Sequence, residues 1–179
     1  MALEGMDIKT YPEKLAGEWS ARLGQRLRQI GIAEAEVEES VHIIHTFTRI
    51  GTEVLIREPE IKLPYGSQTF VLAPEHVHQI IELFLRGVNQ IAKRLRDSGM
   101  PWDQRKLVIE EVSWKIFNLA KLLVAVQNRP APVFRHVIKT HGDLKFLMKH
   151  SADDLLRKHQ SGEPDGPFQF DPEILNRRL

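Results

Sequence analysis

The chain contains no cysteine and only two tyrosines among its 179 residues. Without cysteine it can form no disulfide, thiolate nucleophile, iron–sulfur cluster or cysteine-bearing zinc site. Its eleven glycines are scattered singly, and neither the Walker loop nor the Gly-x-Gly-x-x-Gly pattern of dinucleotide binding occurs. A Gly-x-Ser-x-Gly nucleophile elbow is also missing. The sequence therefore lacks the patterns by which common nucleotide-binding and nucleophilic enzymes are recognised.

Long apolar runs are absent as well. No stretch reaches the roughly 18 consecutive apolar residues that a membrane-spanning helix requires, because Lys115 and Lys121 interrupt the longest candidate. Residues 1–11 include three charged side chains and no apolar run of the kind found in secretory signals. We therefore expect a cytoplasmic protein without a membrane segment.

The composition predicts one folded domain followed by a tail. A hydrophobic fraction of 42% and a charged fraction of 27% are typical of globular chains, and this length suits a single domain. From residue 161 onward, glycines and prolines interrupt any regular structure; they are Gly162, Pro164, Gly166, Pro167 and Pro172. We predict a helical domain over 1–160 and a C-terminal tail over 161–179.

Apolar residues recur at steps of three and four, which indicates amphipathic helices. The segments are 12–30, 34 to about 51, 74–95 and 103–127, with shorter ones at 133–139 and 143–158. In the 103–127 segment a second stripe, formed by Phe117, Ala120 and Val124, joins the first. That segment is predicted to be the central helix, with Asp103 as its N-cap.

Residues 52–72 change to a period of two, which is typical of strands. Pro59 and Pro64 cannot donate hydrogen bonds to a sheet, so we expect a short hairpin or extended arm closed around residues 65–67. The predicted fold class is mainly α, an irregular bundle of four to six helices with a small β-hairpin or extended arm around residues 52–72.

Charge is unevenly distributed although the net charge is only +1. Residues 1–60 carry a net −4, whereas residues 61–130 carry +4 and residues 131–160 carry +3. Lys93, Arg94 and Arg96 form the densest basic group and are the candidate contacts for an acidic protein partner. Nucleic acid is a less favoured partner, because no recognition helix with its turn is evident.

Eight histidines offer the only conventional metal ligands besides carboxylates. His42 and His45 lie three residues apart on one predicted helix, one turn after Glu38, and such spacing can supply part of a zinc or iron site. The third and fourth ligands would have to come from other helices, and the Glu-x-x-His pairs of di-iron bundles are missing. We therefore expect no metal and no cofactor, with these two histidines as the weaker alternative.

The tail carries more apolar surface than a solvated segment needs. Its apolar side chains are Phe168, Phe170, Ile174 and Leu175, which can anchor a partner. The favoured function is a non-enzymatic cytoplasmic interaction module, such as an adaptor, regulator or assembly factor. A histidine-using sensor or metalloprotein is the first alternative and a basic-patch nucleic-acid binder the second. Homo-oligomerisation stays open.

Overall fold

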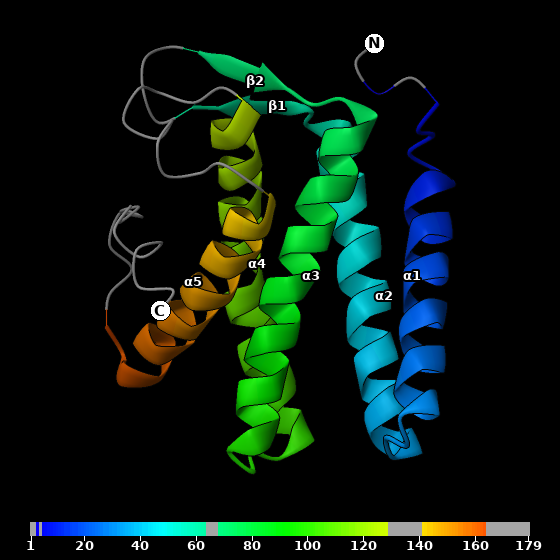
Figure 1. Cartoon of the computed structure of the whole chain (residues 1–179), viewed down its shortest axis with the longest axis vertical. Helices are drawn as coiled ribbons and strands as arrows, with labels where there is room; N and C mark the ends of the chain where they lie inside the picture. The colour runs from blue at the N-terminus through cyan, green and yellow to red at the C-terminus, as the bar shows by residue number, and fades with distance from the viewer. Residues whose placement is uncertain (1–2, 4, 64–67, 129–140, 164–179) are drawn as a thin grey trace. The chain divides into compact units, whose positions relative to one another are not determined.

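A computed structural model describes residues 3, 5–63, 68–128 and 141–163 of the chain. These residues form five α-helices and a two-stranded sheet (Figure 1). The elements are α1 Tyr11–Gln29, α2 Glu34–Arg57, β1 Glu60–Lys62, β2 Thr69–Val71, α3 Pro74–Asp97, α4 Trp102–Asn128 and α5 His141–Ser161. The prediction of a mainly α protein with a small hairpin is therefore confirmed. None of these five helices has the length and apolarity to cross a membrane.

The chain divides into two compact units, each built from two separate stretches of sequence. The first unit comprises Met1–Glu60 and Val71–Ile81. The second unit comprises Ile61–Phe70 and Glu82–Leu179, of which residues 64–67, 129–140 and 164–179 are not described. Helix α3 therefore begins in the first unit and continues in the second.

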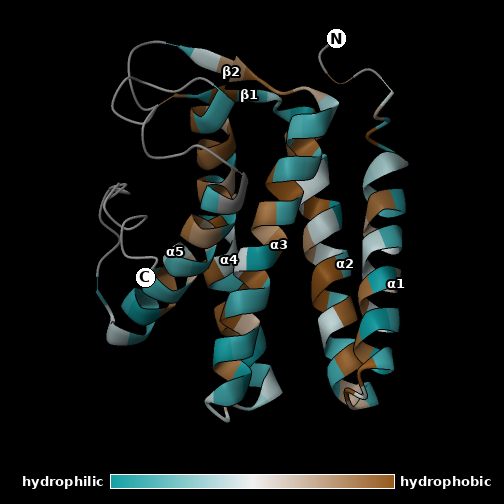
Figure 2. Cartoon of the chain, in the orientation of Figure 1, coloured by the Kyte–Doolittle hydropathy of each residue, from teal (hydrophilic) through white to brown (hydrophobic). Residues whose placement is uncertain are grey.

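In the first unit, α1 and α2 pack side by side (Figure 1). Gly31 ends α1 with a φ of 81°, a conformation that glycine adopts without a steric penalty. Gly24 lets the helices approach closely, since a Cβ at this position would be 3.0 Å from Cγ2 of Val41. The buried apolar residues of these two helices include Leu15, Ala16, Val37, Ile43, Ile44, Phe47 and Leu55. Teal residues predominate on the visible side of α1 in Figure 2, as expected for a helix with one apolar face.

Helix α2 is longer than the sequence pattern indicated. The expectation that it ends near Gly51, with strand-like residues from 52 onward, is wrong, because residues 52–57 complete the helix. Thr52 and Leu55 continue the buried stripe at steps of four and three after Thr48, so burial outweighs the cost of about 1 kcal/mol for a glycine inside a helix. The helix ends at Arg57, and Glu58 leaves the helical conformation, which the following proline at 59 disfavours.

The hairpin is confirmed, but it is confined to residues 60–62 and 69–71. Ile61 and Phe70 are the buried central residues of the two strands, and each has exposed neighbours. Backbone hydrogen bonds continue the pairing on both sides: Leu63 N donates to the Gln68 carbonyl at 3.1 Å, and Leu72 N donates to the Pro59 carbonyl at 2.8 Å.

In the second unit, α4 is buried on most of its circumference, as its two apolar stripes predicted. The buried residues are Ile109, Val112, Ser113, Ile116, Phe117, Leu119, Ala120, Leu123, Val124, Ala125 and Val126. Gly87 of α3 lies against this helix, because a Cβ there would be 2.4 Å from Cγ2 of Ile116 and 3.1 Å from Sδ of Met148 in α5. Three helices therefore meet at Gly87, with almost no space between them.

The helix boundaries in this unit differ slightly from the prediction. Helix α4 begins at Trp102, so Asp103 lies in its first turn and is not the N-cap residue. The indole of Trp102 is covered on one side by the guanidinium of Arg105, 5.5 Å from the ring centroid. The predicted helix at 143–158 is α5, which extends from His141 to Ser161. The predicted helix at 133–139 lies outside the described residues.

Candidate functional site

The structure describes two of the three groups of candidate residues. Lys93, Arg94 and Arg96 lie in the last two turns of α3, in the second unit, and His42 and His45 lie in the middle of α2. The apolar residues of the tail, namely Phe168, Phe170, Ile174 and Leu175, lie outside the described residues.

Arg94 is engaged in a contact between α3 and α5. Its guanidinium donates two hydrogen bonds to the carboxylate of Asp153, from Nε to Oδ1 at 3.1 Å and from Nη2 to Oδ2 at 3.3 Å. The amide of Gln90 donates to the same Oδ1 at 3.0 Å. The hydrogen bond with Asp153 raises the pKa of the Arg94 guanidinium above its ordinary value. Arg94 therefore holds α5 on α3, as a two-point guanidinium–carboxylate contact does.

A second contact between α3 and α5 lies about three turns earlier on α3. Glu82 of α3 accepts Lys145 Nζ of α5 at 3.2 Å and Arg86 Nη2 of its own helix at 3.3 Å, both at Oε1. These partly exposed pairs contribute little stability individually, but they fix which face of α5 meets α3. Several basic side chains of this unit thus have intramolecular roles.

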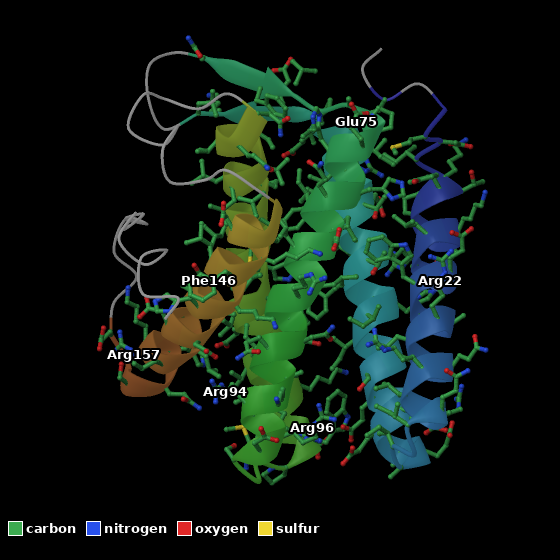
Figure 3. The ribbon with its side chains drawn as sticks, in the orientation of Figure 1. Arg22, Glu75, Arg94, Arg96, Phe146 and Arg157 are labelled. Carbon is green, nitrogen blue, oxygen red and sulfur yellow. The ribbon has the colours of Figure 1, made fainter. Side chains whose placement is uncertain are left out.

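Lys93 and Arg94 are both exposed. Arg96 is half-buried, whereas Lys106, in the first turns of α4, is exposed like Lys93. Figure 3 labels Arg94 and Arg96 near the end of α3, next to the connection to α4. The exposed basic surface at this connection therefore consists chiefly of lysines, together with the solvent-facing part of Arg94, whose side chain is 58% exposed.

The histidines of α2 do not converge on a metal site. His42 is exposed, and Nε2 of His45 lies 2.9 Å from Oε1 of Glu13 on α1. The second oxygen of that carboxylate is 3.9 Å from Nε of Arg49. Within the described parts of the chain, no group of three or more histidine or acidic side chains could hold a metal ion. His45 thus has a structural contact, which joins α2 to the first turn of α1.

Tyr11, Trp19 and His78 form a cluster that no sequence pattern indicated. The hydroxyl of Tyr11 lies 2.6 Å from Nε2 of His78, at the start of α3, and the rings of Tyr11 and Trp19 each have centroids 6.3 Å from that of His78. All three residues belong to the first unit. Because the partners are 67 residues apart, no local pattern could reveal the contact.

The neighbouring His76 has a different role, which a sequence pattern could have suggested. Its Nδ1 accepts the backbone N–H of Ala73 at 2.9 Å, so the side chain at the third position of α3 caps the residue before the helix. Glutamate usually makes this contact. His45 therefore joins α2 to α1, His78 joins α3 to α1, and His76 caps a helix. These three histidines are not arranged around a common ligand.

The titration of Tyr11 provides a direct test of this cluster. Burial and, to a smaller extent, the negative charge of Glu18 raise the pKa of the Tyr11 hydroxyl above 10.0. We expect Tyr11→Phe to remove a step of tyrosinate absorbance that lies above pH 10.0. Because the folded state favours the neutral phenol, this group stabilises the fold below pH 10.0 and loses that contribution as pH rises beyond it. If the step of absorbance that Tyr11→Phe removes lies below pH 10.0, the placement of Tyr11 is wrong.

The two units carry opposite charges. Among the described residues, the first unit has 7 basic and 11 acidic side chains, a net −4. The second unit has 13 basic and 9 acidic side chains, a net +4. The uneven charge along the sequence is therefore also an uneven charge between the two folded units. Such a difference in charge can steer a charged partner toward one of them.

The candidate surface is thus the connection between α3 and α4, which bears exposed lysines in a unit whose described residues have a positive net charge. Comparisons of the chain with protein-family models, with curated proteins and with solved structures gave no significant match.

Proposed function

We propose that this chain is a non-enzymatic, cytoplasmic protein-interaction module, an adaptor, regulator or assembly factor, which binds an acidic protein partner through its second unit. The observation that carries the proposal is the exposure of Lys93 and Lys106 at the α3–α4 connection of a unit whose described residues carry a net charge of +4. A surface of this sign accelerates encounter with an acidic partner and excludes basic ones.

The tail supports the same function from its sequence alone. Four large apolar residues in a short glycine- and proline-rich segment can fill pockets on a partner, and a few buried anchors supply most of the affinity of an interface. Charge on the second unit would then direct the encounter, while the tail would contribute the apolar contacts.

Nucleic acid as the acidic partner is less well supported. The described residues of the second unit carry a net charge of +4, which is modest for a dedicated nucleic-acid binder. The guanidinium of Arg94, which could contact a phosphate at two points, already holds Asp153. The metalloprotein alternative is also less well supported, because two of the histidines already have side-chain contacts. His45 contacts Glu13, and His78 contacts Tyr11.

Reversing the charge of Lys93 and Lys106 tests the proposal. We expect Lys93→Glu combined with Lys106→Glu to weaken capture of the acidic partner by at least about tenfold, because like charges across an interface cost several kcal/mol. Binding would be measured by pull-down from the native cell extract, identification of the captured protein, and titration of that purified protein. Arg94 is kept unchanged because its loss would also free Asp153.

The matched control is Lys14→Glu combined with Arg22→Glu. Both residues are exposed on α1 in the first unit, and the change in net charge is identical. If this control loses the partner as completely as the lysine variant, net charge alone governs capture and the proposed surface is wrong. Capture that nuclease treatment abolishes would instead favour the nucleic-acid alternative. A chain ending at Ser161 measures the contribution of the tail in the same assay.

A further inference from the structure

Arg94 is exposed at the candidate surface, yet its guanidinium is occupied by a carboxylate of the same chain. Nε and Nη2 of Arg94 donate to the two oxygens of Asp153, at 3.1 Å and 3.3 Å. Such a two-point contact is also the way in which an arginine recognises a carboxylate of another protein. An acidic partner would therefore need the same two donors that Asp153 now holds.

Both side chains of this pair are accessible to solvent. The side chain of Arg94 is 58% exposed and that of Asp153 is 39% exposed. Arg94 also follows Lys93, one of the two exposed lysines of the candidate surface. Exposed ion pairs contribute little to stability, because water and salt compete with them. A carboxylate from outside can thus reach the guanidinium and replace Asp153.

Asp153 has a second hydrogen-bond donor when Arg94 leaves it. The side-chain amide of Gln90, one turn before Arg94 on α3, donates to Oδ1 of Asp153 at 3.0 Å. A carboxylate that keeps this donor and its access to water avoids the cost of an unpaired polar group. The contact between Arg94 and Asp153 can therefore open without leaving Asp153 unpaired.

Helix α5 does not depend on this pair for its packing. Its buried apolar residues are Leu144, Leu147, Met148, Ala152 and Leu156. Lys145 of α5 also pairs with Glu82 of α3 at 3.2 Å. Because burial of apolar side chains supplies most of the stabilisation, we expect α5 to stay in place when Arg94 is released.

From these contacts we infer that Arg94 is a further partner-binding residue and that Asp153 competes with the partner for it. The partner supplies an aspartate or glutamate carboxylate, which takes the guanidinium of Arg94 from Asp153 next to Lys93. The inference rests on the proposed function and adds to its surface a residue that the fold masks. Masking lowers the affinity of the parent protein, because only molecules in which Arg94 is released offer the complete surface.

Asp153→Asn tests the inference, because asparagine keeps the size of the side chain and removes its charge. We expect this variant to bind a fluorescent polyglutamate peptide at least about threefold more tightly than the parent protein does, since Arg94 is then available in a larger fraction of the molecules. Fluorescence anisotropy at low salt would measure both dissociation constants. An unchanged or weaker affinity in a folded variant overturns the inference.

Two controls separate the release of Arg94 from a mere change in net charge. Glu163→Gln removes the same charge and also takes a carboxylate from an arginine, because Oε1 of Glu163 accepts Nη1 of Arg157 at 3.0 Å. Figure 3 labels Arg157 on α5 and Arg94 on α3. The Glu163 variant should bind the peptide as the parent does, and Asp153→Asn should give no gain when Arg94→Gln is also present. An equal gain in the Glu163 variant, or a gain that persists without Arg94, overturns the inference.

A measurement on the parent protein does not depend on the folding of any Asp153 variant. Saturating polyglutamate should shift the NMR signal of the Arg94 Nε–H group, which its loss in Arg94→Gln identifies. A signal that saturating peptide leaves unchanged contradicts the inference. Circular dichroism of each variant would show whether its helices are intact.

Failure of the inference and failure of the proposed function give different results. If Lys93→Glu with Lys106→Glu weakens binding of the peptide and Asp153→Asn does not strengthen it, the surface is right and only the masking of Arg94 is wrong. If the lysine variant binds as tightly as the parent, the proposed surface is wrong and the inference fails with it. A gain in affinity for a single-stranded oligonucleotide, without a gain for the peptide, would assign the released guanidinium to phosphate and also overturn the inference.

Discussion

Ile116→Asp should unfold the protein or lower its free energy of unfolding by more than about 4 kcal/mol. Ile116 is fully buried in α4, and the carboxylate would lose its hydration without gaining a described partner. Because a domain has only about 5–15 kcal/mol of stability in total, urea denaturation followed by circular dichroism should show little or no folded baseline. In the parent protein, hydrogen exchange should be slowest for the amides of residues 103–127.

The control for this variant is on the same helix. Leu107 is 63% exposed, so Leu107→Asp introduces the same carboxylate in water, where surface substitutions change stability by about 0.5 kcal/mol or less. If the two substitutions lower the free energy of unfolding equally, helix propensity and not burial decides the effect. The assignment of α4 as the central helix would then be wrong.

Gly87→Ala should destabilise the second unit, although alanine is the better helix former. The added Cβ would lie 2.4 Å from Cγ2 of Ile116 and 3.1 Å from Sδ of Met148, and overpacking of this kind costs about 1–3 kcal/mol. Thermal and urea unfolding of the variant would measure the loss. Combining it with Ile116→Ala removes the methyl group that clashes, so the two effects should fall short of additivity.

Gly17→Ala gives the matched comparison. Gly17 lies within α1, and a Cβ at this position meets nothing within 4 Å, so alanine should stabilise the chain by about 0.5–1 kcal/mol through helix propensity. The same substitution is thus expected to have opposite signs at two helical glycines. Stabilisation by both variants would contradict the close approach of α3, α4 and α5 at Gly87.

Periodicity predicted most of the helices because their apolar stripes are local properties of the chain. Pro74 at the start of α3 and Gly99, with a φ of 78°, just beyond its end mark boundaries that the sequence displays directly. The same logic failed at Gly51, where a glycine inside a buried stripe resembles a stop signal. Burial of Thr52 and Leu55 shows that packing favours continuing the helix, and packing is not visible in a local window.

The candidate surface was only partly predictable for a similar reason. The sequence indicated a basic group at residues 93–96, but it could not distinguish Arg94, whose guanidinium holds Asp153, from the exposed Lys93. Asp153 is 59 residues away from Arg94, and partners at such a separation are found by folding. The contact between Tyr11 and His78 was missed for the same reason.

By itself, the sequence determined the mainly α class, the positions of the long helices, the hairpin between α2 and α3, and the exclusion of cysteine chemistry. These depend on side-chain periodicity, on proline and glycine, and on composition, all of which act over a few residues. Only the tertiary structure decided that α2 extends to Arg57, that Gly87 must remain small, and which charges are used in intramolecular pairs. It also divided the charges between two units, because grouping residues that are distant in sequence requires the close packing of a folded chain.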